Sequence, residues 1–181
     1  MKTFLPSKDP LNEYKTSSKS LDRLADIADQ LPKLLLTSKI QKNINSLKTN
    51  DLSVDLLIKN KNIRELKLAM VQLSFISHAY IWGAKTPSKV LPEALAKPWT
   101  QVANILGRPP ILSYASYCLD NWYRLNKKEN ISLENVGLLT NFLGGVDEDW
   151  FVTIHVCIED AAREAIGAAD SISKLNDKNS V

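Results

Sequence analysis

Glycine, cysteine and histidine are scarce in this sequence, and each shortage excludes classes of protein. The 181 residues include six glycines, two cysteines (Cys118 and Cys157) and two histidines (His78 and His155). Neither the pair Gly144–Gly145 nor any other segment forms a GxGxxG, Walker or GxSxG motif, so no nucleotide loop or nucleophile elbow is indicated. Two cysteines without paired spacing exclude a disulfide framework and are typical of a reducing cytoplasm.

Long apolar runs are also missing. No segment approaches the roughly 20 apolar residues that span a bilayer, and the N-terminus, MKTFLPSKDPLNEY, lacks the apolar run of a signal peptide. The apolar fraction of 44% and the charged fraction of 24% are ordinary for a globular protein. We therefore expect a cytoplasmic protein with no membrane segment.

Charge is unevenly distributed along the chain, whose net charge is +3. Residues 1–64 contain 12 Lys/Arg and 7 Asp/Glu, whereas residues 65–181 contain 11 and 13. A basic part is one feature of modules that bind nucleic acid or membrane surfaces. These lysines are scattered among acids and lack interleaved aromatics, so a solvated helical surface is the better interpretation. We expect neither nucleic acid nor membrane as a partner, and salt-dependent binding to either would favour the alternative.

Apolar residues recur at helical spacing along most of the chain, and alternating strand patterns are missing. This pattern predicts an all-α fold. In the first half of the chain, helices are predicted from Leu21 to Gln30 with Ser20 as the N-cap, onward from Pro32, over 54–60 with Ser53 as the N-cap, and from Ile63 to Trp82 with Gly83 as the stop. The next two are predicted from Pro98, in a first turn, to Gly107 and from Pro109 to about Leu125. The last two are predicted from Ser132 and Asn135 to about Phe142 and, as one long helix, from Glu148 to Leu175.

Prolines and polar segments divide the chain into four predicted parts. Residues 1–17, which include Pro6 and Pro10, are expected to form an extended arm. Residues 18–107 are expected to form a small helical domain and residues 108–175 a second group of helices. Residues 176–181 are polar and are expected to fray.

Two predicted helix faces carry the residues best suited to chemistry. Tyr114, Tyr117 and Cys118 are spaced i, i+3 and i+4, and Phe151 and His155 are spaced i and i+4, so each set shares one face of an ideal helix. Side by side, the two helices would present an aromatic surface with one imidazole. Spacing alone favours the simpler interpretation, in which these are core residues and His155 is a buried, hydrogen-bonded histidine.

The other titratable residues are better explained without chemistry. His78 lies among apolar residues of the long predicted helix and has no neighbour at metal-ligand spacing. The adjacent acids Asp147–Asp149 suit a helix N-terminus. Glu159, one turn after His155, is a candidate to orient it, although a solvated position or a salt bridge is the simpler expectation. Both cysteines are expected to be buried thiols, because no cation is evident to activate them.

Three segments occur in an order that is found in one known family. A long helix ends in Tyr-x-Trp-Gly at Tyr80–Gly83, a Leu-Pro loop follows in VLPEALAKPW, and Pro-Pro-Ile-Leu-x-Tyr-Ala then leads to Asn-Trp within Pro109–Trp122. The last helix is similar over Ile158–Ile166. These features resemble the indoleamine 2,3-dioxygenase family, and we expect a bacterial member. The resemblance covers residues 20–172, is weak before residue 62, and is most specific in the Pro-Pro-Ile-Leu-x-Tyr-Ala string.

The resemblance implies a small N-terminal helical domain followed by helices, residues 108–175, that form the distal wall of a haem pocket in a larger domain. The residues that it places against the substrate are Tyr114, Tyr117, Phe151 and His155. Those that it places against haem b are Tyr114, Cys118, Phe151 and Val152. It gives His155 the catalytic role of holding the substrate. It gives this chain no metal ligand, because the family's proximal histidine and its carboxylate-binding arginine belong to a C-terminal half.

The implied function is a haem-dependent dioxygenase of tryptophan catabolism that inserts O₂ across the indole C2–C3 bond of tryptophan or a related indole, giving N-formylkynurenine-type products. The chain is expected to be an N-terminal portion that works with a C-terminal half, as a fragment or as a separate chain. Tyr117 stands where mammalian members have a cysteine. His155 stands where they have a serine, and where tryptophan 2,3-dioxygenases place a histidine. The alternatives are a related haem enzyme acting on another indole and a non-catalytic helical binding or scaffold domain.

Overall fold

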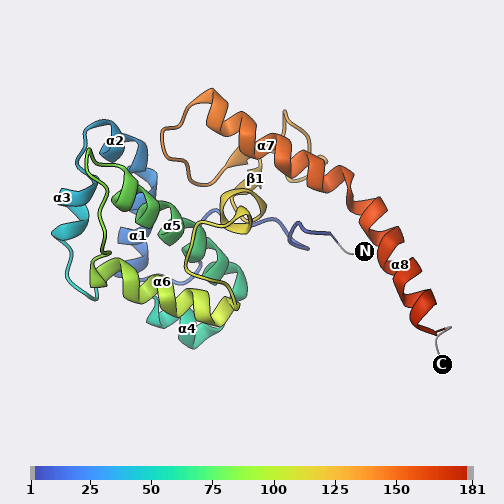
Figure 1. The fold of residues 1–181 in the computed structure, drawn as a ribbon, viewed down its shortest axis with the longest axis horizontal. Coiled ribbons are helices and arrows are strands. Elements are labelled where there is room, and N and C mark those ends of the chain that lie inside the picture. The colour runs from blue at the N-terminus through green and yellow to red at the C-terminus, as the bar shows by residue number, and fades with distance from the viewer. Residues whose placement is uncertain (1–2, 179–181) are drawn as a thin grey trace.

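A computed structural model describes the backbone of residues 3–178 and the side chains as far as residue 174. Within that range the chain forms eight α-helices, one π-helical turn and one two-stranded sheet (Figure 1). In chain order these are α1 (Lys19–Asp29), α2 (Leu31–Leu36), α3 (Ile40–Asn45), α4 (Asp55–Asn60), α5 (Ile63–Trp82), α6 (Glu93–Leu106), the π-helical turn η1 (Ala115–Leu119), β1 (Trp122–Arg124), β2 (Val136–Leu138), α7 (Val146–Ala161) and α8 (Arg163–Lys178). The predicted all-α class is confirmed, because the sheet is a single short hairpin. None of the described helices combines the length and the apolar character that a membrane crossing requires.

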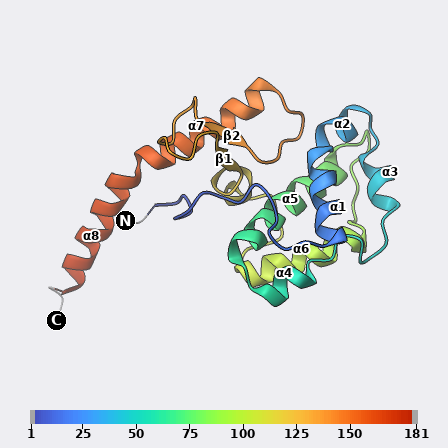
Figure 2. The same cartoon turned by 180° about the vertical axis from the view of Figure 1, so that it is seen from behind.

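Helix α5 is the central element of the larger helical body, and the shorter helices surround it (Figures 1 and 2). Its predicted bounds are confirmed: the Asn62 side chain caps it by accepting a hydrogen bond from the Arg64 N–H (3.2 Å), and Gly83 ends it. Helices α1, α2, α3, α4 and α6 all pack on α5. Its fully buried side chains include Leu66, Met70, Leu73, Phe75 and Ile76. A helix that is apolar all round suits this enclosed position.

The N-terminal arm is bound along this helical body. Glu65, which is buried on α5, accepts hydrogen bonds from the backbone N–H of Lys15 (2.6 Å), the backbone N–H of Thr16 (2.7 Å) and the Thr16 hydroxyl (3.0 Å). The Tyr14 hydroxyl donates to Gln72 Oε1 (2.7 Å). No helix forms in the described part of the arm before α1, and the extended conformation of residues 1–17 stays a prediction.

The predicted cap of the first helix is wrong by two residues. Ser18 caps α1, because its Oγ accepts a hydrogen bond from the Leu21 N–H (3.2 Å). Ser20 is already helical, and its hydroxyl donates to the Ser53 carbonyl oxygen (2.8 Å). Ser20 bonds a residue 33 positions away, and the local sequence does not reveal that this partner draws its hydroxyl away from the cap position.

The predicted start of the helix before Gly107 is also wrong. Helix α6 begins at Glu93, directly after Pro92, so Pro98 lies inside the helix and not in its first turn. The predicted end is confirmed. Gly107 follows the last helical residue with a φ of 63°, the left-handed conformation that glycine adopts most readily.

The two helices predicted over Pro109–Leu125 and 132–142 are wrong. Within 109–125 the helical residues are Tyr114 and the π-helical turn η1 (Ala115–Leu119), which is closed by a bond from the Asp120 N–H to the Ala115 carbonyl (2.8 Å). The strands β1 and β2 then pair antiparallel, with Tyr123 opposite Gly137.

Amide side chains hold this segment in its non-helical form. Asn121 donates to the Thr140 carbonyl (2.7 Å) and accepts from the Thr140 N–H (2.9 Å). Asn135, which was expected near a helix start, accepts from the Asn126 N–H (2.7 Å) and donates to the Asn126 carbonyl (3.0 Å). Such bonds compete with helical backbone hydrogen bonds. Their partners are 9 and 19 residues apart, too far for helical periodicity to reveal.

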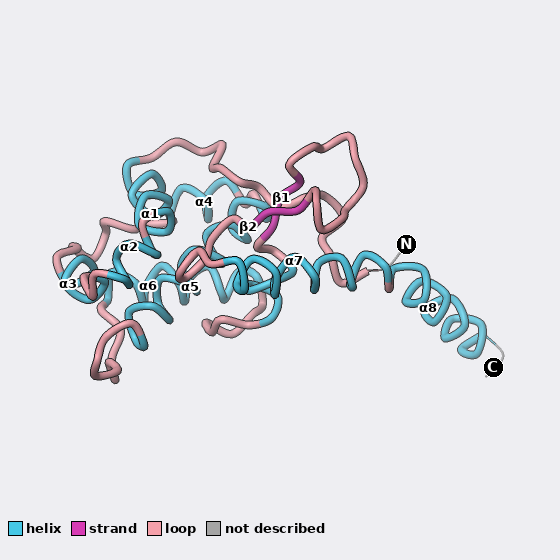
Figure 3. Tube along the Cα trace, turned by 90° about the horizontal axis from the view of Figure 1, so that it is seen from above, coloured by secondary structure: helices cyan, strands magenta, loops and turns pink. Residues whose placement is uncertain are grey.

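The single long helix predicted over Glu148–Leu175 is divided in two. Helix α7 begins earlier, at Val146, and carries the three adjacent acids in its first turn, where negative charge favours the helix dipole. A break at Ala162 separates it from α8, which extends away from the rest of the chain (Figure 3). The frayed end predicted for 176–181 is helical as far as Lys178, and its last three residues lie outside the described part.

Buried apolar side chains gather in two clusters. The first lies around α5 and joins it to α1–α4 and α6. The second joins the arm, η1, the hairpin and α7, and its buried members are Leu5, Cys118, Trp122, Val136, Val152 and Val156. Tyr117 packs against both clusters, so η1 links them. The domain boundary between residues 107 and 108 stays a prediction.

Candidate functional site

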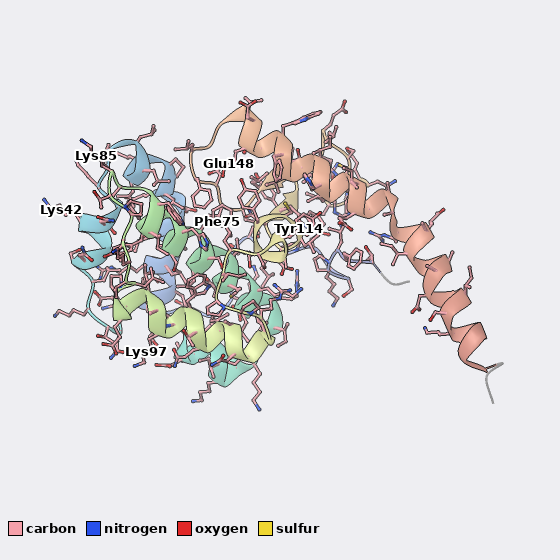
Figure 4. The ribbon with its side chains drawn as sticks, in the orientation of Figure 1. Lys42, Phe75, Lys85, Lys97, Tyr114 and Glu148 are labelled. Atoms are coloured by element: carbon pink, nitrogen blue, oxygen red, sulfur yellow. The ribbon has the colours of Figure 1, made fainter. Side chains whose placement is uncertain are left out.

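An aromatic surface forms where the π-helical turn meets α7 (Figure 4). Phe151 and His155 lie one turn apart on α7, with ring centroids 4.4 Å apart. Tyr114 lies edge-on to His155 at 5.9 Å, and Tyr117 lies 5.8 Å from Phe151. The structure therefore brings the four predicted substrate-contacting residues into one continuous group, which we call the aromatic site.

The aromatic site is open on one side. Tyr114 is 44% exposed, Phe151 is 48% exposed, and Ile158, further along α7, is 55% exposed. The simpler interpretation of Tyr114 and Phe151 as core residues is therefore wrong. Contiguous exposed apolar side chains of this kind mark a surface that a ligand or another protein surface covers.

Tyr117 and Cys118 are more buried than Tyr114. Tyr117 is half-buried and stacks on Phe75 of α5 at 5.4 Å, with an interplanar angle of 9°. Cys118 is fully buried in the second cluster together with Val152. Burial raises the pKa of the Cys118 thiol to about 11, which agrees with the expectation of a neutral buried thiol. Haem contact by Cys118 and Val152 stays a prediction.

The imidazole of His155 is oriented by its own helix. Its Nδ1 lies 2.5 Å from the carbonyl oxygen of Phe151. A carbonyl can only accept a hydrogen bond, so Nδ1 carries the proton, and in the neutral ring Nε2 keeps its lone pair. The ring therefore offers one hydrogen-bond acceptor beside Phe151 and Tyr114.

Glu159 contacts Tyr114 and not His155. The Tyr114 hydroxyl donates to Glu159 Oε1 (2.9 Å), across 45 residues of sequence. Burial, and after it this hydrogen bond, raises the pKa of the Tyr114 phenol above its ordinary value of 10.0. The hydroxyl therefore stays a donor at neutral pH. Glu159 is partly exposed, and the salt bridge expected for it is not found among the described residues.

The start of α7 is fixed by Glu148 (labelled in Figure 4). Its carboxylate accepts hydrogen bonds from three successive backbone N–H groups that begin at Phe142, at 2.7, 2.9 and 3.2 Å. Phe142 packs in turn on Phe75 (4.6 Å) and Tyr117 (6.4 Å). This arrangement connects the aromatic site to α5, so the helical body supports it.

Comparison with known proteins identifies the family. The family model described as indoleamine 2,3-dioxygenase matches residues 1–181. The chain belongs to the indoleamine 2,3-dioxygenase family. It is 38% identical over 162 residues to indoleamine 2,3-dioxygenase of Saccharomyces cerevisiae, with 86% of this chain and 35% of the relative covered. It is 35% identical over 149 residues to indoleamine 2,3-dioxygenase 1 of Rattus norvegicus (81% and 35% covered) and 32% identical over 145 residues to indoleamine 2,3-dioxygenase 2 of Homo sapiens (79% and 34% covered).

Membership of the indoleamine 2,3-dioxygenase family confirms the predicted resemblance. The chain spans about a third of the length of these curated relatives, since 34–35% of each is covered. The relatives named are fungal and mammalian, so a bacterial source stays a prediction.

The side chains present fit one face of the haem that membership of the indoleamine 2,3-dioxygenase family implies. The open rings of Tyr114 and Phe151 suit a flat apolar group. No three His, Cys, Asp or Glu side chains within the described residues are arranged to hold a metal ion. His78 is half-buried on α5, donates from Nδ1 to the Ser74 carbonyl (3.1 Å) and meets Trp99 edge-on at 5.9 Å. Burial lowers the pKa of His78, which agrees with its expected position among apolar residues.

A cavity among the described residues lies away from the aromatic site. It has a volume of about 840 Å³ and lies between the arm, the hairpin and the α7–α8 junction. Its two arginines are already paired, Arg124 with Asp9 (2.8 Å) and Arg163 with Asp160. The candidate site is therefore the open aromatic surface.

Sequence reasoning missed the residues that support the aromatic site. Phe75 and Phe142 carry no signal that separates them from other apolar residues, because their importance depends on Tyr117 packing between segments. Glu159 was noticed for its spacing from His155, but its bond to Tyr114 depends on how η1 and α7 meet.

Proposed function

We propose that the aromatic site is the distal wall of a haem-dependent dioxygenase that inserts O₂ across the indole C2–C3 bond of tryptophan or a related indole, giving N-formylkynurenine-type products. The observation that carries this proposal is the orientation of His155. Its Nδ1–H is held by the Phe151 carbonyl, which leaves Nε2 as an acceptor beside two aromatic rings. An indole is a flat ring with one N–H donor and is complementary to that arrangement.

Each residue of the aromatic site has a proposed role toward the indole. Phe151 packs against the ring, and His155 Nε2 accepts a hydrogen bond from the indole N–H. Tyr114 closes the edge beyond His155, and Tyr117 supports Phe151 from the side of α5. Holding the indole in one register in a water-poor pocket raises the rate of its reaction with a second bound reactant.

The cofactor is proposed to lie against the open side of this surface. Haem b, when bound, supplies the ferrous iron that activates O₂. Tyr114 and Phe151 would contact it, and Cys118 and Val152, buried in the second cluster, would back this wall. The proximal histidine and the cover for the exposed rings are proposed to come from the C-terminal portion that the longer relatives contain, as a fragment or as a separate chain.

The test begins with the intact mass and the ultraviolet–visible spectrum of the purified chain, before and after addition of haem. Indole binding is then measured by titration, with and without the C-terminal portion of a relative. His155→Ala removes one neutral hydrogen bond, so we expect about tenfold weaker indole binding. His78→Gln is the matched control, because it changes the other histidine, which lies on α5 away from the aromatic site.

The outcomes separate the candidate functions. Unchanged indole affinity in His155→Ala contradicts the role of this residue. Absence of a Soret band under every condition, with a well-folded chain, favours a non-catalytic helical binding or scaffold domain. Mass spectrometry of products from tryptophan and from other indoles distinguishes a tryptophan dioxygenase from a related haem enzyme.

A further inference from the structure

We propose that Glu159 is a positioning residue that fixes the ring of Tyr114 against His155. The inference rests on the proposed function to the extent that Tyr114 and His155 face the substrate. It starts from one contact, the bond from the Tyr114 hydroxyl to Glu159 Oε1 (2.9 Å). This bond connects the segment before η1 to α7, and the two residues are 45 positions apart in the sequence.

Tyr114 needs such a restraint because its ring is open. It lies between α6 and η1, in a segment that contains Pro109 and Pro110, and its side chain is 44% exposed. An exposed ring loses rotamer freedom when it is held in one place. Among the described residues Glu159 is the hydrogen-bond partner found for its hydroxyl. A bond to a carboxylate is stronger than one between neutral groups, so it is suited to hold the ring.

Glu159 is available for this task. It lies one turn after His155 on α7, so both side chains project from the same side of a rigid helix. No lysine or arginine forms an ion pair with Glu159 in the part of the chain that the structure describes. The carboxylate therefore places Tyr114 at a fixed position relative to the imidazole, edge-on at 5.9 Å and 73°.

The consequence is that the imidazole is bounded on two sides. Phe151 lies 4.4 Å from His155 and Tyr114 lies 5.9 Å from it. Without Glu159, the Tyr114 ring is free to rotate into solvent, and one wall beside His155 Nε2 is lost. We expect the remaining fold to be unaffected, because Glu159 makes no other hydrogen bond among the described residues.

The experiment uses the chain itself and four variants: Glu159→Ala, Glu159→Gln, Tyr114→Phe and the control Glu134→Ala. Glutamine keeps an acceptor oxygen at the same place, phenylalanine keeps the ring without the donor, and Glu134 is an exposed acid without a hydrogen-bonded side chain among the described residues. In NMR spectra we expect nuclear Overhauser effects between the Tyr114 and His155 rings in the wild type, Glu159→Gln and Glu134→Ala. We expect their loss in Glu159→Ala and Tyr114→Phe. Retention of these effects in Glu159→Ala would overturn the proposal.

Titration with indole distinguishes this inference from the proposed function. If the wild type binds indole, Glu159→Ala should bind it about three- to tenfold more weakly, and Glu159→Gln should restore most of the affinity. Equal affinity in the wild type and Glu159→Ala would exclude a positioning role toward the indole. If the ring contacts respond as expected but the wild type does not bind indole with or without haem and the C-terminal portion, the proposed function fails, while the restraint of Tyr114 by Glu159 stands.

Discussion

Replacement of Asp120 by asparagine tests how η1 is anchored to the helical body. Asp120 follows η1 and its side chain is only 2% exposed. Its Oδ1 lies 3.0 Å from Lys67 Nζ on α5, and its Oδ2 lies 2.6 Å from Arg108 Nη1, which follows α6. One buried carboxylate therefore ties three segments together, and the variant changes its charge with almost no change in shape.

The exposure of the three side chains sets the expected loss in the free energy of unfolding. Removal of one partner from a buried ion pair costs about 3–5 kcal/mol in the free energy of unfolding. The side chains of Lys67 and Arg108 are 27% and 25% exposed, so both cations can regain water and the loss is smaller. We expect about 2–3 kcal/mol for Asp120→Asn, which corresponds to a fall in Tm of about 4–12 °C for a domain of this size.

The assay is urea and thermal unfolding followed by circular dichroism. The control is Asp26→Asn, an exposed acid on α1, for which we expect a change within about 0.5 kcal/mol. A double-mutant cycle with Lys67→Met should depart from additivity by more than about 0.5 kcal/mol, because the two side chains are in contact. A loss in Asp120→Asn no larger than that in Asp26→Asn would refute the anchoring argument.

Two further predictions concern titration in the folded chain. Burial, and after it the Glu65 carboxylate, raises the pKa of the Tyr14 phenol well above its ordinary value of 10.0. Above about pH 10 the unfolded chain loses the Tyr14 proton, whereas the folded chain keeps it. The free energy of unfolding therefore does not depend on Tyr14 titration below about pH 10, and it falls by up to about 1.4 kcal/mol per pH unit above that. Urea unfolding of Tyr14→Phe should show a shallower fall with pH than the wild type, and equal slopes would contradict this. Iodoacetamide should label Cys157, which is partly buried, before Cys118, which is fully buried and whose pKa burial raises to about 11. Mass spectrometry would measure the two labelling rates, and equal rates would contradict the described packing.

Helix α5 shows which part of the fold a sequence can predict. Its predicted ends, Ile63 and Trp82, are those of the structure, because both signals are local. The Asn62 side chain bonds an N–H two residues later, and Gly83 ends the helix directly. Because α5 is buried on all sides, its bounds could be predicted without knowing which of its faces packs against which neighbouring helix.

The segment between Arg108 and Phe142 shows the opposite case. Its apolar residues do recur at helical spacing, but the side chains of Asp120, Asn121 and Asn135 determine the backbone conformation. These side chains bond residues that are distant in sequence or on other segments. Propensity is a weak preference, and several buried polar bonds outweigh it. A single sequence does not show which asparagine will meet which carbonyl.

The π-helical turn decides how much of the candidate site spacing could reveal. In an α-helix Tyr114 and Tyr117, three positions apart, would lie on one face. In a turn closed by a bond over five residues, each residue advances by a smaller angle, so a side chain three positions later falls further short of that face. Tyr114 is accordingly 44% exposed beside His155, whereas Tyr117 is half-buried and stacks on Phe75 of α5. This wider turn lets Tyr114 reach Glu159 while Tyr117 packs on the helical body, so the site and the packing beneath it depend on one local irregularity that helical periodicity does not predict.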